Sequence, residues 1–317
     1  MGSNLFVFYV ISMSVFLSFV IWKARRHEIR AEFSHPPRGQ FLNVNGHRVH
    51  VEVRGKGPDL VLIHGASGST RDMTFELAQH LEDRYRLLIF DRPGLGYSDR
   101  INQTGATLEQ QADLLSEAAA QLGADRPIVM GQSYGGAVAL TWAARFPDRI
   151  SALVPVAAVS CIWASPLNTY YRIVSHKWLG PLTIPLITAF VPDAHVDKVL
   201  ASVFVPQDEP KGYGAYFGPG LTLRRKTLRA NGLQRANLLE EIRALQPHFG
   251  SISVPTEIVH GEEDTTVPAW NHAERLVSRI QGAHLTLLPG IGHMPHHVAP
   301  KEVVAAIDRA ATRAGLH

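Results

Sequence analysis

The chain has 317 residues but a single cysteine, Cys161. One cysteine cannot form an intramolecular disulfide, and it excludes zinc or iron–sulfur sites built from several cysteines. Charge is also scarce, because charged residues make up only 19% of the chain and leave a net charge of +3. Nucleic-acid-binding proteins concentrate far more basic charge than this. We therefore expect no nucleic-acid partner.

Charge is missing altogether from residues 4–22. A helix of that length would be about 28 Å long, close to the thickness of the hydrocarbon core of a bilayer. A cleaved signal peptide is the alternative interpretation, and it needs a basic start and a small-residue cleavage site. The first three residues carry no basic side chain, and Lys23 follows the apolar stretch at once. We predict an uncleaved, single-pass N-terminal anchor.

The basic residues next to this stretch predict its orientation. Lys23, Arg25, Arg26 and Arg30 all lie on its C-terminal side. Cytoplasmic flanks of membrane spans are enriched in Lys and Arg, so we expect the catalytic domain on the cytoplasmic side rather than the periplasmic or extracellular side. Residues 31–39, which contain two prolines, are predicted to be a stiff linker.

From residue 40 onward, strand-like and helix-like segments alternate. An Asn45-Gly46 pair, a strong hairpin signal, separates residues 40–44 from residues 48–54. Short apolar runs typical of buried parallel strands follow, and segments with helical spacing of apolar residues separate them. The runs are residues 59–63, 86–90, 127–130, 153–159, 257–260 and 285–288. This order predicts an α/β fold with a mostly parallel sheet flanked by helices.

Residues 161–250 interrupt the alternation. They are rich in proline and aromatic residues, and we interpret them as helical pieces inserted between two strands. We therefore divide the chain into an anchor and linker at 1–39, a core formed by 40–160 and 251–317, and an inserted cap at 161–250.

Ser133 lies in the sequence G-Q-S-Y-G-G, which contains the pattern G-x-S-x-G. An apolar run precedes the pattern and a helix-forming segment follows it, and this strand–turn–helix setting is what a nucleophile elbow requires. Gly131 and Gly135 allow the backbone to close tightly around a strained serine whose hydroxyl projects above the sheet. We predict that Ser133 is a catalytic nucleophile.

A serine hydroxyl needs a nearby base to become a good nucleophile. The chain has 16 histidines, and His293 lies on a loop directly after the last strand-like run. His296 and His297 lie close by and are the alternatives. A metal site formed by these three histidines is a further interpretation, but no carboxylate motif supports it and we expect no metal. We predict that His293 is the base.

The histidine in turn needs a carboxylate to fix its tautomer and to stabilise its charged form. Asp264 follows the strand-like residues 257–260 in the sequence H-G-E-E-D. Spacing alone cannot rank neighbouring carboxylates on a loop, so Glu263 stays as the alternative. We predict that Asp264 completes the triad.

Ester hydrolysis by a serine passes through an oxyanion that backbone N–H groups stabilise. Tyr134 follows the predicted nucleophile at the start of a helix, and its amide is one predicted donor. Ala66 lies in the small-residue loop H-G-A-S-G after an earlier strand, and its amide is the other. His64 begins this loop, and we expect it to shape the loop rather than to take part in catalysis.

Five motifs in this order resemble the α/β-hydrolase superfamily, and the resemblance covers residues 40–313. The motifs are H-G-A-S-G from His64, D-R-P-G-L-G-Y-S from Asp91, G-Q-S-Y-G-G from Gly131, G-E-E-D-T-T-V-P from Gly261 and G-H at Gly292. The resemblance implies an eight-stranded sheet and a helical cap inserted after the sixth strand. It also implies that the triad occurs in the chain order Ser133, Asp264, His293.

The serine narrows the chemistry that the resemblance implies. Members similar to haloalkane dehalogenases and epoxide hydrolases carry an aspartate at the elbow, whereas Ser133 favours acyl transfer to water. The chain therefore resembles a serine esterase or lipase, which needs no cofactor. The resemblance also implies that Asp91 and Arg92 have a structural role in the loop after the fourth strand.

Two features favour lipid or other long-chain acyl esters as substrates. The anchor would hold the site within reach of bilayer lipids, and the apolar run at residues 179–191 is predicted to form an acyl-chain pocket. Arg224, Arg225, Lys226 and Arg229 are predicted to contact phosphate head groups. Ordinary cap core and a solvated helix face are the competing interpretations of these two segments.

Two other functions remain as alternatives. A carbon–carbon bond hydrolase of the meta-cleavage-product type would use the same serine triad and a similar cap, although such enzymes generally have no anchor. A non-catalytic binding protein on the same scaffold is the second alternative, and the complete candidate triad argues against it.

Overall fold

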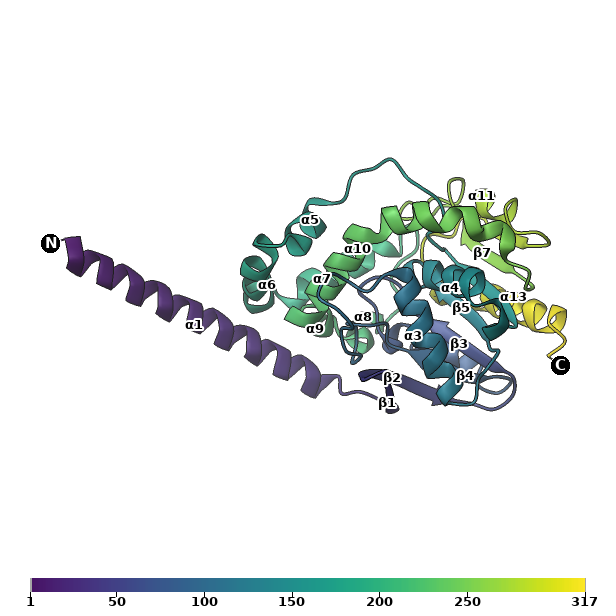
Figure 1. Ribbon diagram of the computed structural model, residues 1–317, viewed down its shortest axis with the longest axis horizontal. Helices are drawn as coiled ribbons and strands as arrows, with labels where there is room; N and C mark the ends of the chain where they lie inside the picture. The colour runs from purple at the N-terminus through teal and green to yellow at the C-terminus, as the bar shows by residue number, and fades with distance from the viewer. Residues whose placement is uncertain (1, 317) are drawn as a thin grey trace.

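Eight strands form one sheet at the centre of the molecule in the computed structural model, which describes residues 2–316 (Figure 1). Their order across the sheet is β1-β2-β4-β3-β5-β6-β7-β8. The first two pairings, β1 with β2 and β2 with β4, are antiparallel, and all others are parallel. The strands are β1 (Gln40–Val44), β2 (His47–Arg54), β3 (Asp59–Ile63), β4 (Arg86–Phe90), β5 (Ile128–Gln132), β6 (Ala152–Val156), β7 (Glu257–Gly261) and β8 (His284–Leu288). The predicted α/β fold with an eight-stranded, mostly parallel sheet is confirmed.

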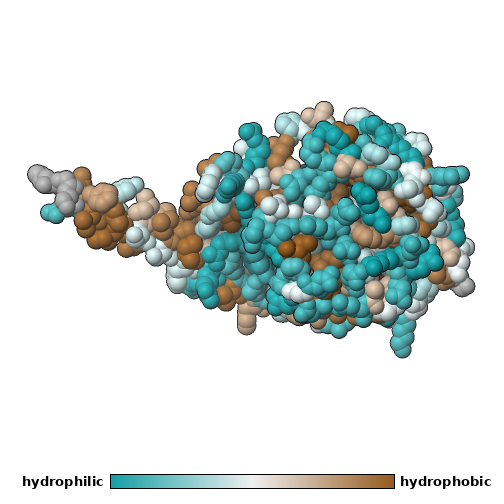
Figure 2. All heavy atoms as spheres, in the orientation of Figure 1, coloured by the Kyte–Doolittle hydropathy of each residue, from teal (hydrophilic) through white to brown (hydrophobic). Residues whose placement is uncertain are grey.

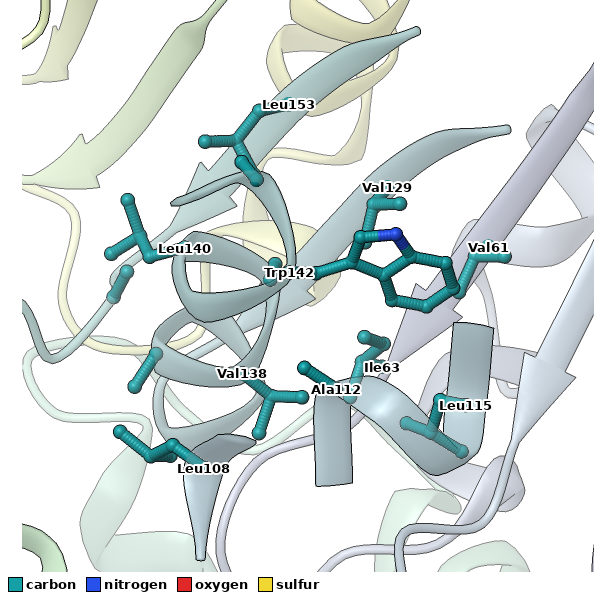
Figure 3. Packing of buried hydrophobic residues seen from close by; sticks show 14 of the residues in the cluster. Val61, Ile63, Leu108, Ala112, Leu115, Val129, Val138, Leu140, Trp142 and Leu153 are labelled. Atoms are coloured by element: carbon teal, nitrogen blue, oxygen red, sulfur yellow. The ribbon is translucent and has the colours of Figure 1, made fainter. Parts of the chain in front are cut away.

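Helices cover both faces of this sheet, so the central strands are apolar on both sides. In β3, Leu60 and Leu62 pack in one core cluster, whereas Val61 and Ile63 pack in the other. Figure 3 shows the face of the sheet that carries Val61 and Ile63, where Trp142 lies among side chains from the strands and from a neighbouring helix. The helices of the core are α2 (Thr70–Thr74), α3 (Leu108–Gln121), α4 (Tyr134–Arg145), α11 (Ala273–Val277), α12 (Pro295–Val298) and α13 (Pro300–Arg313), with 3-10 turns at Leu77–His80 and Pro147–Arg149.

The predicted helical insertion lies between β6 and β7, after the sixth strand, and we call it the cap. The longest cap helix, α10, reaches back to the core, where Leu238, Ile242 and Leu245 join the cluster that contains α3 and α4. The cap therefore shares its packing with the core. Its helices are α5 (Thr169–Ser175), α6 (Leu179–Phe190), α7 (Asp193–Val203), α8 (Tyr213–Phe217), α9 (Pro219–Thr222) and α10 (Arg225–Leu245), followed by a 3-10 turn at Gln246–Ser251.

A single long helix, α1 (Gly2–Ser34), projects from this body (Figure 1). Side chains at residues 4–19 are all exposed, and most of them are apolar, as the brown stalk in Figure 2 shows. By length and composition, α1 is the one helix within residues 2–316 that is able to cross a membrane by itself. Helices α6 and α7 pass the same test only as a pair, and they are bent by 100° relative to each other.

The C-terminal part of α1 differs from the sequence prediction. We predicted a linker at residues 31–39, but the helix continues to Ser34 because its last turns pack against the cap. Ala31 is buried there, and Glu28 and Glu32 form ion pairs with Arg225 and Arg224. Contacts between distant parts of the chain therefore extend the helix.

Candidate active site

Ser133 lies between the end of β5 and the start of α4, at the predicted elbow. Its backbone has φ +53° and ψ −114°, a conformation that is strained for a residue with a side chain. Close backbone packing requires the flanking glycines. A Cβ atom on Gly131 would lie 2.1 Å from the carbonyl oxygen of Gly135, and one on Gly135 would lie 2.3 Å from that of Ile63. The G-x-S-x-G pattern thus fits the tight turn that presents the serine.

The structure brings Ser133, His293 and Asp264 together. His293 Nε2 lies 3.1 Å from Ser133 Oγ, and His293 Nδ1 lies 2.7 Å from Asp264 Oδ2. A carboxylate can only accept hydrogen bonds, so Nδ1 carries the proton and Nε2 is free to accept the serine proton. Ser133 is only 8% exposed, which keeps bulk water from competing for these contacts. The geometry is that of a nucleophile, its base and an orienting acid.

The environment of Asp264 keeps its carboxylate ionised. Its Oδ1 atom accepts hydrogen bonds from the backbone N–H groups of Thr266 and Val267, at 2.9 and 2.8 Å. Burial alone would raise the pKa of Asp264, but hydrogen bonds from His260 and His293 outweigh burial and lower this pKa well below its usual range. The alternative carboxylate, Glu263, is exposed. The structure thus favours Asp264 over its neighbour.

The loop that carries His293 is fixed by two glutamines that the sequence analysis did not identify. Gln132 precedes the nucleophile and donates a hydrogen bond to the His293 carbonyl oxygen at 3.2 Å. Gln207 comes from the cap, accepts a hydrogen bond from the Gly292 N–H at 3.0 Å and donates one to the Gly290 carbonyl oxygen at 2.5 Å. Gln132 could have been found as the second residue of the elbow motif, whereas Gln207 has no motif.

Ala66 and Tyr134 carry the backbone amides that we predict as oxyanion-binding donors, and Tyr134 directly follows Ser133 in the chain. Within residues 2–316, neither amide is engaged in a hydrogen bond. Tyr134 begins α4, and the unpaired N–H groups of a helix N-terminus favour a nearby negative charge. Ala66 lies in the loop after β3, next to Gly65, whose α-carbon faces Gln132 and Ser133. The role of these two amides as oxyanion donors stays a prediction.

Two buried side chains hold the loop that contains Ala66. Arg92 is fully buried and donates hydrogen bonds to the carbonyl oxygens of His64 and Gly65, at 3.0 and 2.9 Å. His64 uses both ring nitrogens internally, since Nε2 accepts from the Arg92 N–H and Nδ1 donates to the Gly65 carbonyl. Burial, together with the charge of Arg92, lowers the pKa of His64 to about 4, so the ring is neutral. These contacts fit the structural roles that we expected for His64 and Arg92.

The cap also contributes to this loop through helix α10. Asn231 accepts a hydrogen bond from the Ser67 N–H at 3.0 Å and donates one to the Ser67 hydroxyl at 2.8 Å. Gln234 accepts a hydrogen bond from Arg92 at 2.8 Å. Neither residue was predicted from the sequence, because nothing in the local pattern of an amphipathic helix marks residues that contact a distant loop.

His296 and His297, the alternatives to His293, belong to a different cluster. His297 Nε2 donates to Asp72 Oδ1 at 2.9 Å, Tyr213 donates to the same oxygen at 2.7 Å, and His296 Nε2 lies 3.5 Å from Asp72 Oδ2. These ligand atoms of Asp72, His296 and His297 lie within 4.8 Å of one another, so they are the candidate metal ligands. His293 is not part of that group. The metal interpretation that combined all three histidines is therefore wrong.

Three of the four residues of the predicted basic cluster, Arg224, Arg225 and Arg229, make contacts within the protein. Arg224 is buried and contacts Glu32, Arg225 pairs with Glu28, and Arg229 donates to the carbonyl oxygens of Val174 and His176. The predicted contact of Arg224 and Arg225 with phosphate head groups is therefore wrong, because α1 occupies these two side chains.

The apolar run at residues 179–191 also differs from its prediction as an acyl-chain pocket. Its inward side chains, Ile184 and Ile187, pack in a cluster with other cap residues. Leu182 and Leu186 face outward and are exposed. The run is thus a surface helix with cap core on one side.

Comparisons with known proteins agree with this architecture. A sequence model of the α/β hydrolase fold matches residues 58–300, which is most of the chain, so the protein belongs to the α/β-hydrolase family. The chain is 26% identical over 275 residues to the pimeloyl-[acyl-carrier protein] methyl ester esterase of Nitrosomonas europaea, and the match covers 82% of this chain and 98% of the esterase. The protein is accordingly a hydrolase of this family.

Two solved structures share the fold. A membrane phospholipase A, described as a bacterial virulence factor, superimposes with a TM-score of 0.66 at 20% identity, over 97% of each chain. A meta-cleavage product hydrolase from Pseudomonas fluorescens superimposes with a TM-score of 0.64 at 18% identity, over 86% of this chain and 98% of that one. At these identities the likeness defines the architecture and leaves the substrate to be argued from the site.

Proposed function

We propose that this protein is a membrane-anchored serine hydrolase that cleaves carboxylic esters, in particular lipid or other long-chain acyl esters. The observation that carries the proposal is the continuous hydrogen-bonded chain from Ser133 Oγ through His293 to Asp264. The esterase among its relatives supports ester hydrolysis, and the exposed apolar part of α1 supports an anchor.

The proposed reaction has two halves. Ser133 Oγ attacks the ester carbonyl carbon while His293 Nε2 takes the hydroxyl proton, and the amides of Ala66 and Tyr134 stabilise the oxyanion. Collapse of the intermediate breaks the ester bond, and His293 returns the proton to the leaving alkoxide. Water, activated by the same nitrogen, then attacks the acyl-enzyme and releases the carboxylic acid. Asp264 stays ionised and stabilises the charged His293 in both halves.

The lipid part of the proposal rests on location. The charge-free part of α1 is long enough to span a bilayer, and its basic flank favours a catalytic domain on the cytoplasmic side. Contacts between α1 and the cap would then hold Ser133 at a fixed distance from the bilayer surface. A substrate dissolved in the membrane would reach such a site without entering bulk water.

A series of esters with chains from short to long tests the proposal. The full-length protein in detergent or vesicles should hydrolyse the series with a preference for long chains, and Ser133→Ala should abolish turnover. Ser278→Ala, at an exposed serine of the core, is the matched control and should retain activity. Activity confined to short soluble esters, with no product from lipid vesicles, would contradict the lipid part.

A carbon–carbon bond hydrolase is the second candidate, and the fold shared with a meta-cleavage product hydrolase supports it. If no ester is cleaved while a fluorophosphonate still labels Ser133, vinylogous diketones are the next substrates to assay. If the folded protein neither turns over any substrate nor reacts with the probe at Ser133, a binding function without catalysis replaces both proposals.

A further inference from the structure

Helix α6 of the cap presents an apolar stripe to solvent. Leu179, Leu182, Leu186 and Phe190 are all exposed, and their spacing places them along one side of the helix. Trp178, which precedes the helix, is exposed as well. The whole segment from residue 178 to 191 contains no charged residue. Contiguous exposed apolar surface of this kind is unusual in a soluble domain and marks an interaction surface.

The opposite side of α6 is firmly packed, so the orientation of the stripe is fixed. Ile184 is buried in the cap cluster that contains Val174 and Leu223. Thr188 is buried too, and its hydroxyl donates a hydrogen bond to the Leu223 carbonyl oxygen at 2.7 Å. Rotation of α6 to bury the stripe would break these contacts. The stripe is therefore a permanent feature of the surface.

The C-terminal end of α6 contacts α1 at one position along the axis of α1. Ala189 packs with Val20 and Ala24, and the Phe190 ring lies 6.5 Å from the ring of Phe19. Lys23 Nζ lies 4.2 Å from the centre of the Phe190 ring. At this position along α1, the charge-free stretch ends and the basic flank begins. Figure 2 shows hydrophobic side chains along the stalk and again where it joins the body.

The residues around the stripe are those that occur at a bilayer surface. Lys177 Nζ lies over the ring of Trp178 at 5.2 Å, and Arg26 lies over the ring of Trp22 at 5.0 Å. Trp side chains favour the interfacial region of membranes, and Lys and Arg favour anionic head groups. Helix α6 itself has 12 residues, about 18 Å, which is too short to span a bilayer but sufficient to lie in its surface.

We propose that the α6 stripe docks into the leaflet from which α1 emerges, so that the cap rests on the membrane at a second point. This inference rests on the proposed role of α1 as an anchor. A membrane surface is favoured over a second protein chain because the stripe is continuous with the apolar surface of α1 and bordered by basic side chains. Two points of attachment fix the orientation of the cap, whereas α1 alone would allow rotation about its axis.

Depth-dependent fluorescence quenching tests this docking. Single cysteines are introduced at Phe8, Leu182 and Trp270 in the full-length protein, labelled with an environment-sensitive dye and reconstituted into vesicles that contain spin-labelled lipids. The native Cys161 is buried, so it does not compete for the dye. Phe8→Cys reports the anchor, and Trp270→Cys reports the core beside α11, far from α1 in Figure 1.

We expect quenching at position 8 inside the bilayer, quenching at position 182 only near the bilayer surface, and none at position 270. Quenching at 8 without quenching at 182 would overturn the docking but leave the anchor intact. Absence of quenching at both positions would overturn the anchor and the docking together. If instead the dye at position 182 is shielded from water in a way that depends on protein concentration and not on the spin-labelled lipids, the stripe contacts a second copy of the chain.

Charge substitution provides an independent test. Leu182→Glu places a charge on the stripe, and Trp270→Glu is the matched control, because the two native side chains are 67% and 68% exposed. We expect Leu182→Glu to lower the ratio of turnover on anionic lipid vesicles to turnover on a soluble ester by about tenfold. The reason is that the variant puts a charge where the apolar Leu182 side chain is proposed to enter the leaflet. Trp270→Glu should leave this ratio within about twofold. Equal effects of the two variants would contradict the proposal.

Discussion

At the scale of single residues, the proposed catalysis depends on which carboxylate accepts a hydrogen bond from His293. Asp264 is buried and accepts hydrogen bonds from His293, His260 and two backbone amides, whereas Glu263 points to solvent. Within residues 2–316, Asp264 is the hydrogen-bond partner of His293 Nδ1, so this carboxylate fixes the tautomer of His293.

Replacement of this carboxylate by an amide gives a direct prediction. Asp264→Asn should lower kcat by about 10³-fold or more, with a smaller change in KM, because the amide no longer stabilises the charged imidazole. Glu263→Gln is the matched control and should stay within about twofold. Steady-state kinetics on one soluble ester measures both variants. Comparable losses of kcat in the two variants would show that Asp264 is not the carboxylate of the triad.

Buried histidines predict how stability depends on pH. Burial lowers the pKa of His64, His272 and His296 to about 4, whereas the same side chains in the unfolded chain take up protons near 6.5. Between these values the unfolded chain binds more protons, so the free energy of unfolding falls as the pH is lowered from 6.5 to 4. Each histidine contributes a slope of about 1.4 kcal/mol per pH unit within that window.

Denaturant unfolding at several pH values checks this slope. His296→Asn should flatten the decline below pH 6.5, because one buried histidine no longer has to remain neutral. His195→Gln, at an exposed cap residue, should leave the slope unchanged. A stability that stays constant down to pH 4 in the wild type would contradict the prediction.

Residues with a local signal were predictable from the sequence. Ser133 lies between glycines at a strand–helix junction, and His293 and Asp264 each follow a strand-like run. The local sequence pattern was therefore sufficient to predict all three triad residues. Asp72 has no such signal. Its contacts with His297 and Tyr213 join parts of the chain that are far apart in sequence, and only the folded packing of core and cap brings them together.

At the scale of elements, helix α10 does more than cover the site. Its Asn231 makes two hydrogen bonds to Ser67, in the loop that carries the Ala66 amide, and Ser67 has the positive φ of +59°. The cap therefore holds one of the proposed oxyanion donors in place. Movement of α10 would change the position of that donor.

Removal of this contact should impair catalysis more than binding. Asn231→Ala is expected to lower kcat by about tenfold, because the Ala66 amide loses its fixed position relative to the oxyanion. Asn237→Ala removes a similar amide from the same helix, where it contacts the Thr104 carbonyl oxygen, and should change kcat by less than about twofold. An increase in KM alone after Asn231→Ala would contradict a role in positioning the donor.

The strands and the helical insertion were predictable because apolar periodicity and turn residues are local. The end of α1 was not, because Glu28, Ala31 and Glu32 are ordinary helix residues whose partners lie in the cap. The outward face of α6 was also not predictable, since the helix has no charged residue to mark a solvent side and only packing decides which side is buried.

At the scale of the whole molecule, α1 and the cap form a continuous unit. Glu28 accepts hydrogen bonds from the backbone and the guanidinium of Arg225, at 2.7 to 2.9 Å. Burial alone would raise the pKa of Glu28, but its contacts with Arg225 lower it. The proposed anchor is thus attached to the catalytic body by ion pairs as well as by the peptide chain.

Charge reversal tests this attachment. Glu28→Lys and Arg225→Glu should each lower the Tm by several degrees, because each leaves a partly buried charge without its partner, and the double variant should recover part of the loss. The exposed pair Glu240 and Arg243 is the matched control, and reversal there should change the Tm by about one degree or less. Additive losses in the Glu28 and Arg225 double variant would show that the two residues are not coupled.

Ester hydrolysis through Ser133 requires a covalent acyl-enzyme, and trapping that species is the direct test of the proposed mechanism. The protein is mixed with an activated long-chain ester, quenched with acid within milliseconds and measured by intact and peptide mass spectrometry. We expect one added acyl group located on Ser133, which is absent in Ser133→Ala and persists longer in His293→Ala whenever that variant acylates at all. An acyl group on another residue, or ester turnover by Ser133→Ala at the wild-type rate, would show that Ser133 is not the nucleophile.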